Sequence, residues 1–265
     1  MPTDQIKKAI QSGWDRMSAT YQSETRISLD DIHYGPLCPG ERELRLLGDV
    51  RGKRVLELAC GAAQNSIALA KWNAHVVAMD ISPEQLAAAR ALVARESVAV
   101  HLARGDMEQL GMFADGRFDI VISSFGWEFV PDLAACFAEC NRVLKKGGLL
   151  VVCTVHPLAA FEWDQAEEAL LVTDYFNPPV ELWGDLQGAG RGHAMTFYHT
   201  VQELFGLLTS CGFRVERVLE PFPYALETMT DSERLEIPYG GQFWESQYER
   251  LCRVPFSIVL TGRKS

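Results

Sequence analysis

The stretch "RVLELACGAAQNSIALAK", residues 54–71, decides the fold class of this chain. It joins an apolar run at 54–59, a turn around Gly61 and an amphipathic run at 64–72, which is typical of a buried strand, a tight turn and a helix. Backbone N–H groups at the N-terminus of such a helix have no partner within the helix, so they favour an anionic or zwitterionic ligand. The stretch therefore predicts a ligand-binding loop at one edge of a parallel sheet.

The rest of the chain continues the alternation of short apolar runs and longer amphipathic segments, which is typical of a parallel sheet with crossover helices. We therefore predict an α/β fold with a seven-stranded, mostly parallel sheet, helices on both faces and an antiparallel last strand. The expected strands are 54–59, 75–80, 100–105, 118–124, 148–155, 214–221 and 256–264, and the expected helices lie near 64–72, 83–96 and 132–144.

Two stretches break this alternation. Residues 157–198 contain "NPPVELWGDLQGAGRG", which is rich in Gly, Pro and Trp and has no clear period, and 222–254 is a second irregular stretch. We expect one domain formed by 1–156 and 199–265, in which 1–49 forms an N-terminal helical cap. Residues 157–198 are then an insertion that acts as a lid over the carboxyl edge of the sheet.

Composition narrows the classes of partner. The formal net charge of the 265 residues is −10, and no Lys/Arg run could neutralise several phosphates, which disfavours nucleic acid. The seven cysteines form no CxxC pair and no zinc spacing, which indicates a reduced, cytoplasmic protein without a metal site. No apolar run approaches 18 residues, so we expect no membrane insertion. A homodimer remains an open alternative.

Acidic residues follow the second and third expected strands. Asp80 ends the second strand, 23 residues beyond Glu57, where a carboxylate can accept both hydroxyls of a ribose. Asp106 and Met107 follow the third strand, where a carboxylate and a backbone N–H can meet the edge of an adenine. Asp80 can also be interpreted as a helix cap, a role that Ser82 fills more naturally. Because open α/β sheets bind ligands at the carboxyl ends of their strands, these residues predict a nucleoside site.

Two classes of nucleoside ligand fit this arrangement. Nicotinamide dinucleotide sites also have glycines after the first strand and an acid at the end of the second. From Ala59 onward this chain reads A-C-G-A-A-Q, with Gln64 at the position of the third glycine. The pattern disfavours a nicotinamide dinucleotide but leaves it open.

With "DIVISSFGWEFVPD" (119–132) after the fourth strand, these stretches in order resemble the class I S-adenosylmethionine-dependent methyltransferases. The resemblance is to the small-molecule branch that includes ubiquinone and menaquinone methyltransferases. It covers roughly 50–156 and, more loosely, "HTVQELFGLLTSCGFRVERVLEP" (199–221). It implies a Rossmann-like fold, S-adenosyl-L-methionine as the cofactor and S-adenosyl-L-homocysteine as its product.

The resemblance also implies a cofactor role for individual residues. The "WDRMSATY" segment resembles the leading helix of that family, so Tyr21 is a candidate to close over the cofactor. The remaining implied cofactor residues are Glu57, Ala59 and Gly61 at the methionine end, Asp80 on the ribose, Ile81 on the adenine face, Asp106 and Met107 at the adenine edge, and Ser123 through its backbone carbonyl to the amino group.

The first loop departs from that family, which usually has glycine where this chain has Ala59 and Ala63. A glycine with positive φ resists replacement, whereas one needed only for close approach tolerates alanine. We expect the loop to function if the φ angle of Ala59 is negative and only its carbonyl faces the methionine amino group. A positive φ would indicate the relic of a binding loop.

Methyl transfer from a sulfonium requires an in-line arrangement of acceptor, methyl and sulfur, with water excluded. A base is needed only if the acceptor holds its proton, and His156 is the first candidate. Glu128 is the second, because burial among aromatic residues would raise its pKa. Candidate contacts to the acceptor are Tyr34, Trp127 and His199, although each also suits a purely structural role.

The sequence therefore predicts a cytoplasmic enzyme that transfers a methyl group from S-adenosyl-L-methionine to a small organic molecule. Oxygen is favoured as the acceptor atom, ahead of nitrogen and carbon. "SSFGWEF" stands where nucleobase methyltransferases have an Asn/Asp-Pro-Pro-Tyr motif, which again favours a small acceptor. A nicotinamide-dependent oxidoreductase and a non-catalytic protein that binds S-adenosylmethionine or S-adenosylhomocysteine are the alternatives.

Overall fold

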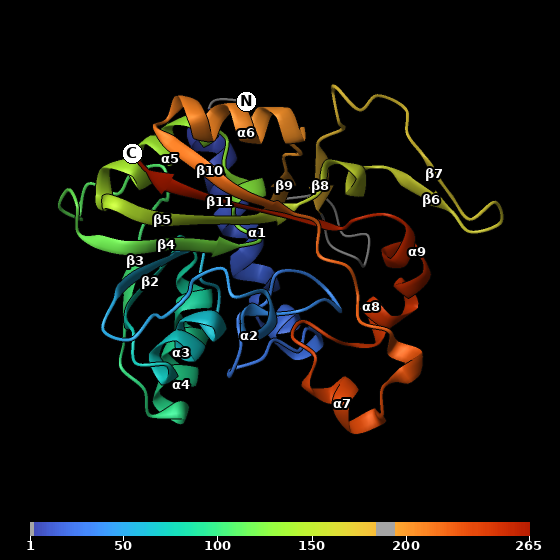
Figure 1. Cartoon of the computed structure of the whole chain (residues 1–265), viewed down its shortest axis with the longest axis horizontal. Coiled ribbons are helices and arrows are strands. Elements are labelled where there is room, and N and C mark those ends of the chain that lie inside the picture. The colour runs from blue at the N-terminus through green and yellow to red at the C-terminus, as the bar shows by residue number, and fades with distance from the viewer. Residues whose placement is uncertain (1–2, 184–193) are drawn as a thin grey trace.

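The apolar runs of the sequence form a seven-stranded sheet in the computed structural model, which describes residues 3–183 and 194–265 (Figure 1). The strand order is β10-β11-β5-β4-β1-β2-β3. The strands are β1 (Arg54–Leu58), β2 (His75–Asp80), β3 (Val100–Arg104), β4 (Phe118–Ser124), β5 (Leu144–Val155), β10 (Phe213–Leu219) and β11 (Ser257–Lys264). The predicted α/β fold is confirmed, and β2 and β4 begin and end at the predicted residues.

Strand pairing places a ligand crevice next to β1. The strands β1 to β5 pair in parallel, whereas β11 runs antiparallel between β5 and β10, as predicted for the last strand. The chain adds β2 and β3 on one side of β1 and β4 and β5 on the other, so the strand order reverses at β1. In open α/β sheets ligands bind outside the carboxyl ends of the strands at such a switch point.

Helices cover both faces of the sheet, with α5 and α6 on one face and α3 and α4 on the other (Figure 1). Successive strand residues point to opposite faces. Leu56 thus packs in one buried cluster with Phe137 of α5, and Val55 in another with Leu69 of α3. The main helices are α1 (Thr3–Glu24), α2 (Glu41–Leu44), α3 (Gln64–Lys71), α4 (Pro83–Glu96), α5 (Leu133–Val143) and α6 (Val201–Ser210).

The two irregular stretches contain short elements. A 3-10 helix and two β-hairpins lie in 157–198, and strands of three residues are too short to show an alternating pattern. Residues 184–193 of this insertion lie outside the described residues. A second group of short helices lies in 222–254. The elements are η2 (Pro157–Ala160), β6 (Glu162–Asp164), β7 (Ala169–Leu171), β8 (Glu181–Trp183), β9 (Ala194–Thr196), η3 (Leu226–Thr228), α7 (Asp231–Glu236), α8 (Gln242–Ser246) and α9 (Tyr248–Arg253).

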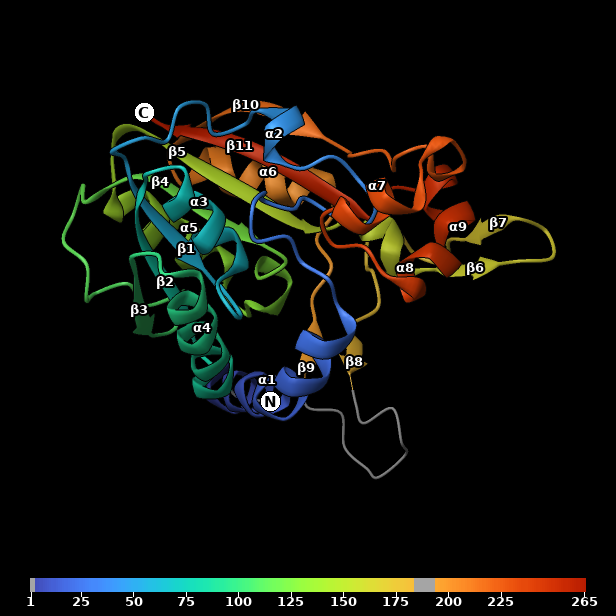
Figure 2. The ribbon, with the colours of Figure 1, turned by 90° about the horizontal axis from the view of Figure 1, so that it is seen from below.

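Helix α1 packs on neither face of the sheet. It contacts α4 and β9, and Figure 2 shows it lying between the end of α4 and the β8–β9 hairpin. Helix α4 follows the carboxyl end of β2. Because α1 packs against α4, it passes beside the edge of the sheet where the first loop opens. The N-terminal segment is therefore close to the predicted ligand site.

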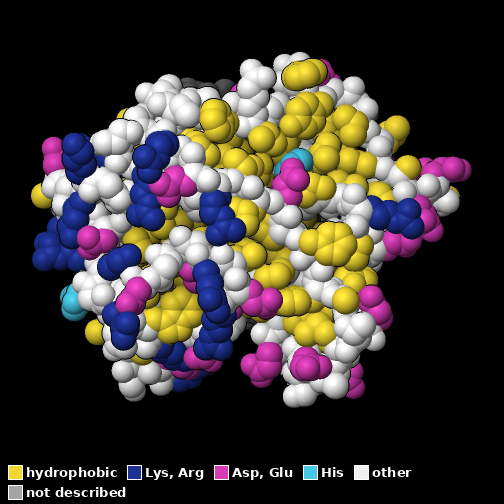
Figure 3. Space-filling view, in the orientation of Figure 1, with side chains coloured by type: hydrophobic (Ala, Val, Ile, Leu, Met, Phe, Trp, Pro, Cys, Tyr) yellow, Lys and Arg dark blue, Asp and Glu magenta, His cyan; other side chains and the backbone are white. Residues whose placement is uncertain are grey.

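The surface differs in composition between the two ends of the molecule. Figure 3 shows hydrophobic side chains gathered over the end of the molecule that carries the insertions, with Lys and Arg at the opposite end. Large exposed apolar side chains on the insertions and on the adjoining α6 and β10 are Leu171, Val172, Phe176, Val180, Phe205, Val218, Phe222 and Phe243. Within residues 3–183 and 194–265, no helix is both long enough and apolar enough to cross a membrane.

Candidate functional site

The turn after β1 contains three residues with left-handed backbone conformation. Ala59, Gly61 and Ala63 have φ angles of 49°, 54° and 63°. The N–H of Cys60 donates to the carbonyl of Met79 at 3.0 Å, and the N–H of Gly61 donates to Oδ2 of Asp80 at 2.8 Å. The loop is thus attached to the end of β2, in the crevice that the strand order predicts.

The expectation of a negative φ for a functional loop at Ala59 is wrong. A left-handed alanine costs about 1–2 kcal/mol, which is small beside a domain stability of about 5–15 kcal/mol. Gly126 makes room for this alanine, since a Cβ added at Gly126 would overlap the Cβ of Ala59. The residues after β4 therefore make room for the Ala59 side chain in this conformation.

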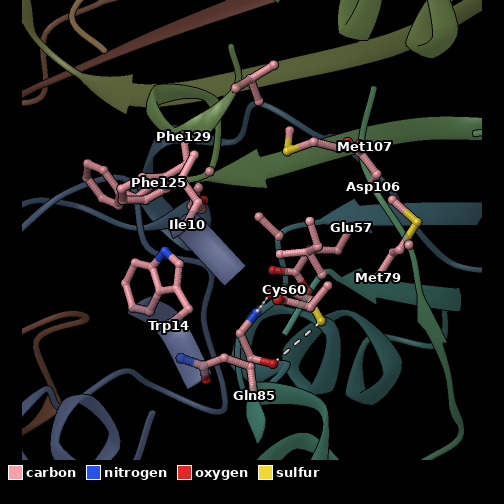
Figure 4. A pocket seen from close by; sticks show the side chains of 18 of the residues that line it. Ile10, Trp14, Glu57, Cys60, Met79, Gln85, Asp106, Met107, Phe125 and Phe129 are labelled. Atoms are coloured by element: carbon pink, nitrogen blue, oxygen red, sulfur yellow. Dashed lines mark hydrogen bonds between the residues drawn. The ribbon is translucent and has the colours of Figure 1, made fainter. Parts of the chain in front are cut away.

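A cavity with about 980 Å³ of empty space, including the solvent at its opening, lies beside this loop, and its two walls differ in chemistry (Figure 4). The wall next to the loop, here named the carboxylate wall, carries the side chains of Glu57, Asp80, Asp106 and Glu108. The opposite wall, here named the aromatic wall, carries Trp14, His33, Phe125 and Phe129. In Figure 4 Trp14, Phe125 and Phe129 face Glu57 and Asp106 across the cavity.

Two carboxylates of this wall are almost fully buried. Burial raises the pKa of Glu57 to about 7 and that of Asp80 to about 6. Glu57 accepts a hydrogen bond from the hydroxyl of Ser66, and Asp80 accepts from the N–H groups of Gly61 and Ser82, each at 2.8 Å. A carboxylate has about four lone-pair sites, so each of these can accept further donors from a ligand.

Ser82, and not Asp80, caps the helix that follows β2. The hydroxyl of Ser82 accepts from the N–H of Gln85 at 3.1 Å and caps α4. The second oxygen of Asp80 instead holds the first loop. Asp80 therefore links the ends of β1 and β2 at the cavity, as a ligand-binding acid at this edge would.

Asp106 lies in the carboxylate wall but already has a cationic partner. Its Oδ2 accepts from Nζ of Lys7 at 2.7 Å, and Lys7 also pairs with Glu108. Sequence reasoning missed this lysine. The signal was the helical spacing of Lys7, Ile10 and Trp14, which continues to Tyr21 and places all four on the face of α1 that lines the cavity.

Most of the predicted cofactor residues meet at the cavity, whereas Ser123 does not. Its carbonyl accepts from the indole N–H of Trp127 at 3.1 Å, and Ser124 and Phe125 line the cavity in its place. The role predicted for the Ser123 carbonyl therefore needs correction. The predicted residues that line the cavity are Tyr21, Glu57, Ala59, Gly61, Asp80, Ile81, Asp106 and Met107.

His156 does not line the cavity, and both of its ring nitrogens are occupied. Nδ1 accepts from the N–H of Leu158 at 3.1 Å and caps η2, which leaves the proton on Nε2 for Oε1 of Glu220 at 3.0 Å. Burial lowers the pKa of His156, an effect that Glu220 opposes. A ring without a free lone pair cannot accept a proton, so the position and partners of His156 do not support its predicted role as a catalytic base.

The residues of η1 (Trp127–Phe129) divide between core and cavity. Trp127 is fully buried against Phe137, with ring centroids 5.3 Å apart, so its predicted contact with an acceptor is wrong. Glu128 is buried outside the cavity lining and accepts from Thr154 at 3.0 Å. Burial raises its pKa to about 7, as expected, but its position does not support the predicted role as a base. Phe129 is the member of η1 that reaches the cavity.

Tyr34 and His199 also lie outside the cavity lining, in contrast to the prediction. Tyr34 is fully buried in the sheet core, where its hydroxyl donates to Glu41 at 2.7 Å. His199 lies between β9 and α6, and burial lowers its pKa. The neighbour of Tyr34, His33, lines the cavity instead. Consecutive residues of an extended segment point to opposite sides, so only one of the pair faces the site.

Tyr239 reaches this site from the second irregular stretch. Its ring stacks on His33 with centroids 4.7 Å apart, and its hydroxyl lies 2.8 Å from that of Tyr21. No sequence signal joins residues so far apart in the chain. Among the described residues, no group of three or more His, Cys, Asp or Glu side chains is arranged to hold a metal ion.

Comparisons with known proteins agree with this geometry. Residues 56–152 match the family described as "Methyltransferase domain". An uncharacterized methyltransferase of Bacillus subtilis is 30% identical over 130 residues, which are 49% of this chain and 51% of that protein. A ubiquinone biosynthesis O-methyltransferase of Xylella fastidiosa is 34% identical over 167 residues, which are 57% of this chain and 68% of that protein.

A crystal structure of an S-adenosylmethionine-dependent methyltransferase from Mesorhizobium loti has the same fold, with a TM-score of 0.66, 23% identity, and coverage of 83% of this chain and 95% of that one. The chain spans about half the length of the Bacillus relative. The fold is a Rossmann-like sheet, and the carboxylates at the carboxyl ends of its strands are typical of a site for a nucleoside-containing ligand. The chain belongs to the class I S-adenosylmethionine-dependent methyltransferases, whose cofactor is S-adenosyl-L-methionine.

Proposed function

We propose that this protein transfers a methyl group from S-adenosyl-L-methionine to a small organic acceptor, with oxygen as the acceptor atom ahead of nitrogen or carbon. The observation that carries the proposal is one cavity in which the carboxylate wall faces the aromatic wall. The related ubiquinone biosynthesis O-methyltransferase supports a hydroxyl acceptor. The net charge of −10 supports a small molecule rather than a nucleic acid.

The residues of the carboxylate wall fit the cofactor. When bound, S-adenosyl-L-methionine supplies an electrophilic methyl group on a positively charged sulfur. Glu57 and the loop at Ala59 and Gly61 would hold its methionine end, and Asp80 its ribose. Ile81 would contact its adenine, together with Asp106 and Met107, and the adenine amino group would then compete with Lys7 for Asp106.

The aromatic wall would exclude water and orient the acceptor. Trp14 packs edge to face against Phe129, with ring centroids 5.3 Å apart, and against Tyr21 at 5.4 Å. Such packed rings offer an apolar surface that positions an acceptor without charge. Because positioning supplies most of the acceleration in a displacement of this type, their rigidity serves the reaction directly.

We also propose that α1 acts as a lid, together with the insertion at 157–198. The contacts of α1 to the cofactor side are polar: Asp15 accepts from the Ser82 hydroxyl at 2.6 Å, and Gln22 accepts from Gln64 at 2.7 Å. Partly buried hydrogen bonds of this kind contribute about 0.5–1.5 kcal/mol each. They can break to admit ligands and form again over them.

Calorimetric titration with S-adenosyl-L-methionine, S-adenosyl-L-homocysteine and NAD tests the cofactor assignment. We expect both sulfur compounds to bind and NAD not to bind. Incubation of the protein with methyl-labelled cofactor and a metabolite extract should then yield a labelled small molecule. Tight binding of NAD without binding of S-adenosylhomocysteine would favour the oxidoreductase. Firm cofactor binding with no transfer to any extract would favour a non-catalytic binding protein.

A further inference from the structure

The aromatic wall contains one polar side chain whose hydrogen-bonding capacity is unused. His33 is about 5% exposed, and its Nδ1 has no hydrogen-bond partner among the described residues. Among the other buried polar atoms that lack a partner there, those of Ser123, His199 and Arg234 belong to residues outside the cavity lining. An unsatisfied buried polar group costs about 1–3 kcal/mol. A ligand in the cavity that bonds to this ring would recover that cost.

The imidazole is held in position from several sides. The backbone N–H of His33 donates to the Asn65 side chain at 3.3 Å, and its carbonyl accepts from the hydroxyl of Ser124 at 3.0 Å. Its ring lies nearly parallel to those of Phe125 and Tyr239, with interplanar angles of 11° and 21°. Asn65 lies in the first turn of α3, which follows the cofactor loop, so the backbone of His33 is fixed relative to the cofactor side.

The surroundings keep this imidazole neutral. Burial lowers the pKa of His33 to about 3. The titratable group packed against its ring is Tyr239, whose hydroxyl bonds to that of Tyr21, and the charged side chain acting on both tyrosines is Glu128. Burial raises the pKa of Tyr21 to about 12 and that of Tyr239 well above its usual value, so both are uncharged at neutral pH. A neutral imidazole offers one N–H donor and one free lone pair.

The charges of the cavity select against an anionic acceptor. Its lining holds four carboxylates, and its lysine, Lys7, is already paired with two of them. On the aromatic wall the two tyrosine hydroxyls at Tyr21 and Tyr239 bond to each other. Within the aromatic wall as defined above, His33 is the side chain with a nitrogen lone pair that can accept a hydrogen bond from an uncharged donor.

We propose that His33 binds an uncharged hydroxyl acceptor and takes its proton during methyl transfer, an inference that rests on the proposed function above. The bond between acceptor oxygen and methyl carbon forms as the bond between carbon and sulfur breaks, and the electron pair of the broken bond stays on sulfur. The hydroxyl proton passes to the free nitrogen of His33. The positive charge lost at sulfur appears on the imidazolium, so the total charge in the cavity is unchanged.

Binding to the S-adenosylhomocysteine complex gives the first test, without turnover. The probes are 2-naphthol and its methyl ether, 2-methoxynaphthalene, which lacks the hydroxyl proton. We expect the native protein to prefer the naphthol by about 2–10-fold, the range of one hydrogen bond. His33→Phe keeps a flat ring between Phe125 and Tyr239 and should lose the preference. His101→Phe, at an exposed histidine of β3, is the matched control.

The rate of methyl transfer gives the second test. For 2-naphthol, His33→Phe and His33→Asn should lower kcat by about 10²-fold, the lower end of the usual contribution of a general base, because burial makes this imidazole a weak base that accepts the proton only as the oxygen is methylated and becomes strongly acidic. The native rate should be flat from pH 6 to 9 because the ring is neutral throughout. The rate of either variant should rise with pH toward the pKa of the probe. For 4-nitrophenol, which ionises readily near neutral pH, the loss should be much smaller.

The outcomes separate the two levels of inference. Failure of the native protein to bind S-adenosylhomocysteine contradicts the proposed function itself. If the complex forms but the label goes to benzylamine and to no hydroxyl probe, only the assignment of His33 is wrong. Equal losses of kcat for the two phenols in His33→Phe would also overturn the assignment of His33. So would a His33→Phe protein with full activity and unchanged affinity for S-adenosylhomocysteine.

Discussion

The carboxylate wall and the aromatic wall of the cavity are built from different kinds of chain segment. The acids of the carboxylate wall lie at or just after the ends of β1, β2 and β3, within residues 57–108. The aromatic wall collects Trp14 of α1, His33, and Phe125 and Phe129 after β4, with Tyr239 behind it. The comparison teaches that a continuous segment defines the cofactor side, whereas distant segments have to meet to form the acceptor side.

The largest expected effect tests the carboxylate wall. Asp80→Ala removes both the anchor of the Gly61 N–H and the carboxylate proposed for the ribose. We expect S-adenosylhomocysteine to bind about 30–150-fold more weakly by calorimetry, or roughly 2–3 kcal/mol. Asp119→Ala is the control, because Asp119 also accepts a backbone N–H, that of Arg54 at 2.9 Å, but at the opposite edge of the sheet. Equal affinities for native and Asp80→Ala protein would refute the role of Asp80.

The second-largest expected effect is a change in the stability of the unliganded protein when Glu57 is replaced. Its pKa is raised from 4.5 to about 7 in the folded protein, so its contribution to stability is fully present below pH 4.5 and is lost as pH rises through 7. Glu57→Gln has no such loss and should stabilise the unliganded protein by about 1–3 kcal/mol at pH 8, with little effect at pH 4.5. Thermal melting at both pH values measures this difference.

The same substitution should weaken the binding of S-adenosylhomocysteine, because the amide carries no charge for the ammonium group of the ligand. For the native protein we expect affinity to rise between pH 5.5 and 7.5 as Glu57 and Asp80 ionise, with proton release on binding. Calorimetry in two buffers of different ionisation enthalpy detects that release. A Glu57→Gln protein that is less stable at pH 8 would show that the carboxylate has a structural role.

The smallest effect concerns the strain of the first loop. Ala59→Gly should relieve a left-handed alanine, worth about 1–2 kcal/mol, at an entropic cost of about 0.4–1 kcal/mol in the unfolded chain. We expect a net gain of about 0.5–1 kcal/mol, or a few degrees in Tm. Ala78→Gly, within the buried strand β2, should instead lower Tm. A lower Tm for Ala59→Gly would show that the alanine methyl group contributes packing that outweighs its strain.

A double variant locates the compensation for that strain. Gly126→Ala should destabilise the native protein, because the new Cβ overlaps that of Ala59. In the Ala59→Gly protein the same change meets only the hydroxyl of Ser123, at 2.6 Å, and should cost less. Additive changes in stability would mean that the two residues are independent.

The sheet and the carboxylate wall could be predicted because their signals are local. Apolar runs of strand length and acids at strand ends, such as Asp80 and Asp106, stand in the sequence beside the elements that place them. The predicted contacts to the acceptor, Tyr34, Trp127 and His199, lie outside the cavity lining because the choice between neighbouring residues is not a local property of the sequence. Trp127 lies in the core, whereas Phe129 lines the cavity. In the same way Tyr34 lies in the core, whereas its neighbour His33 lines the cavity.

The sequence by itself determined the strands of the sheet, the loop after β1 and the position of Asp80 and Asp106 at strand ends, because each of these signals lies within a few residues of the chain. Only the tertiary structure decided which side chains face the acceptor. The pairing of Lys7 with Asp106 and the stacking of Tyr239 on His33 join segments about 100 and 200 residues apart. The physical reason is that side-chain direction in irregular segments is set by what packs against them, and sequence spacing carries no record of that packing.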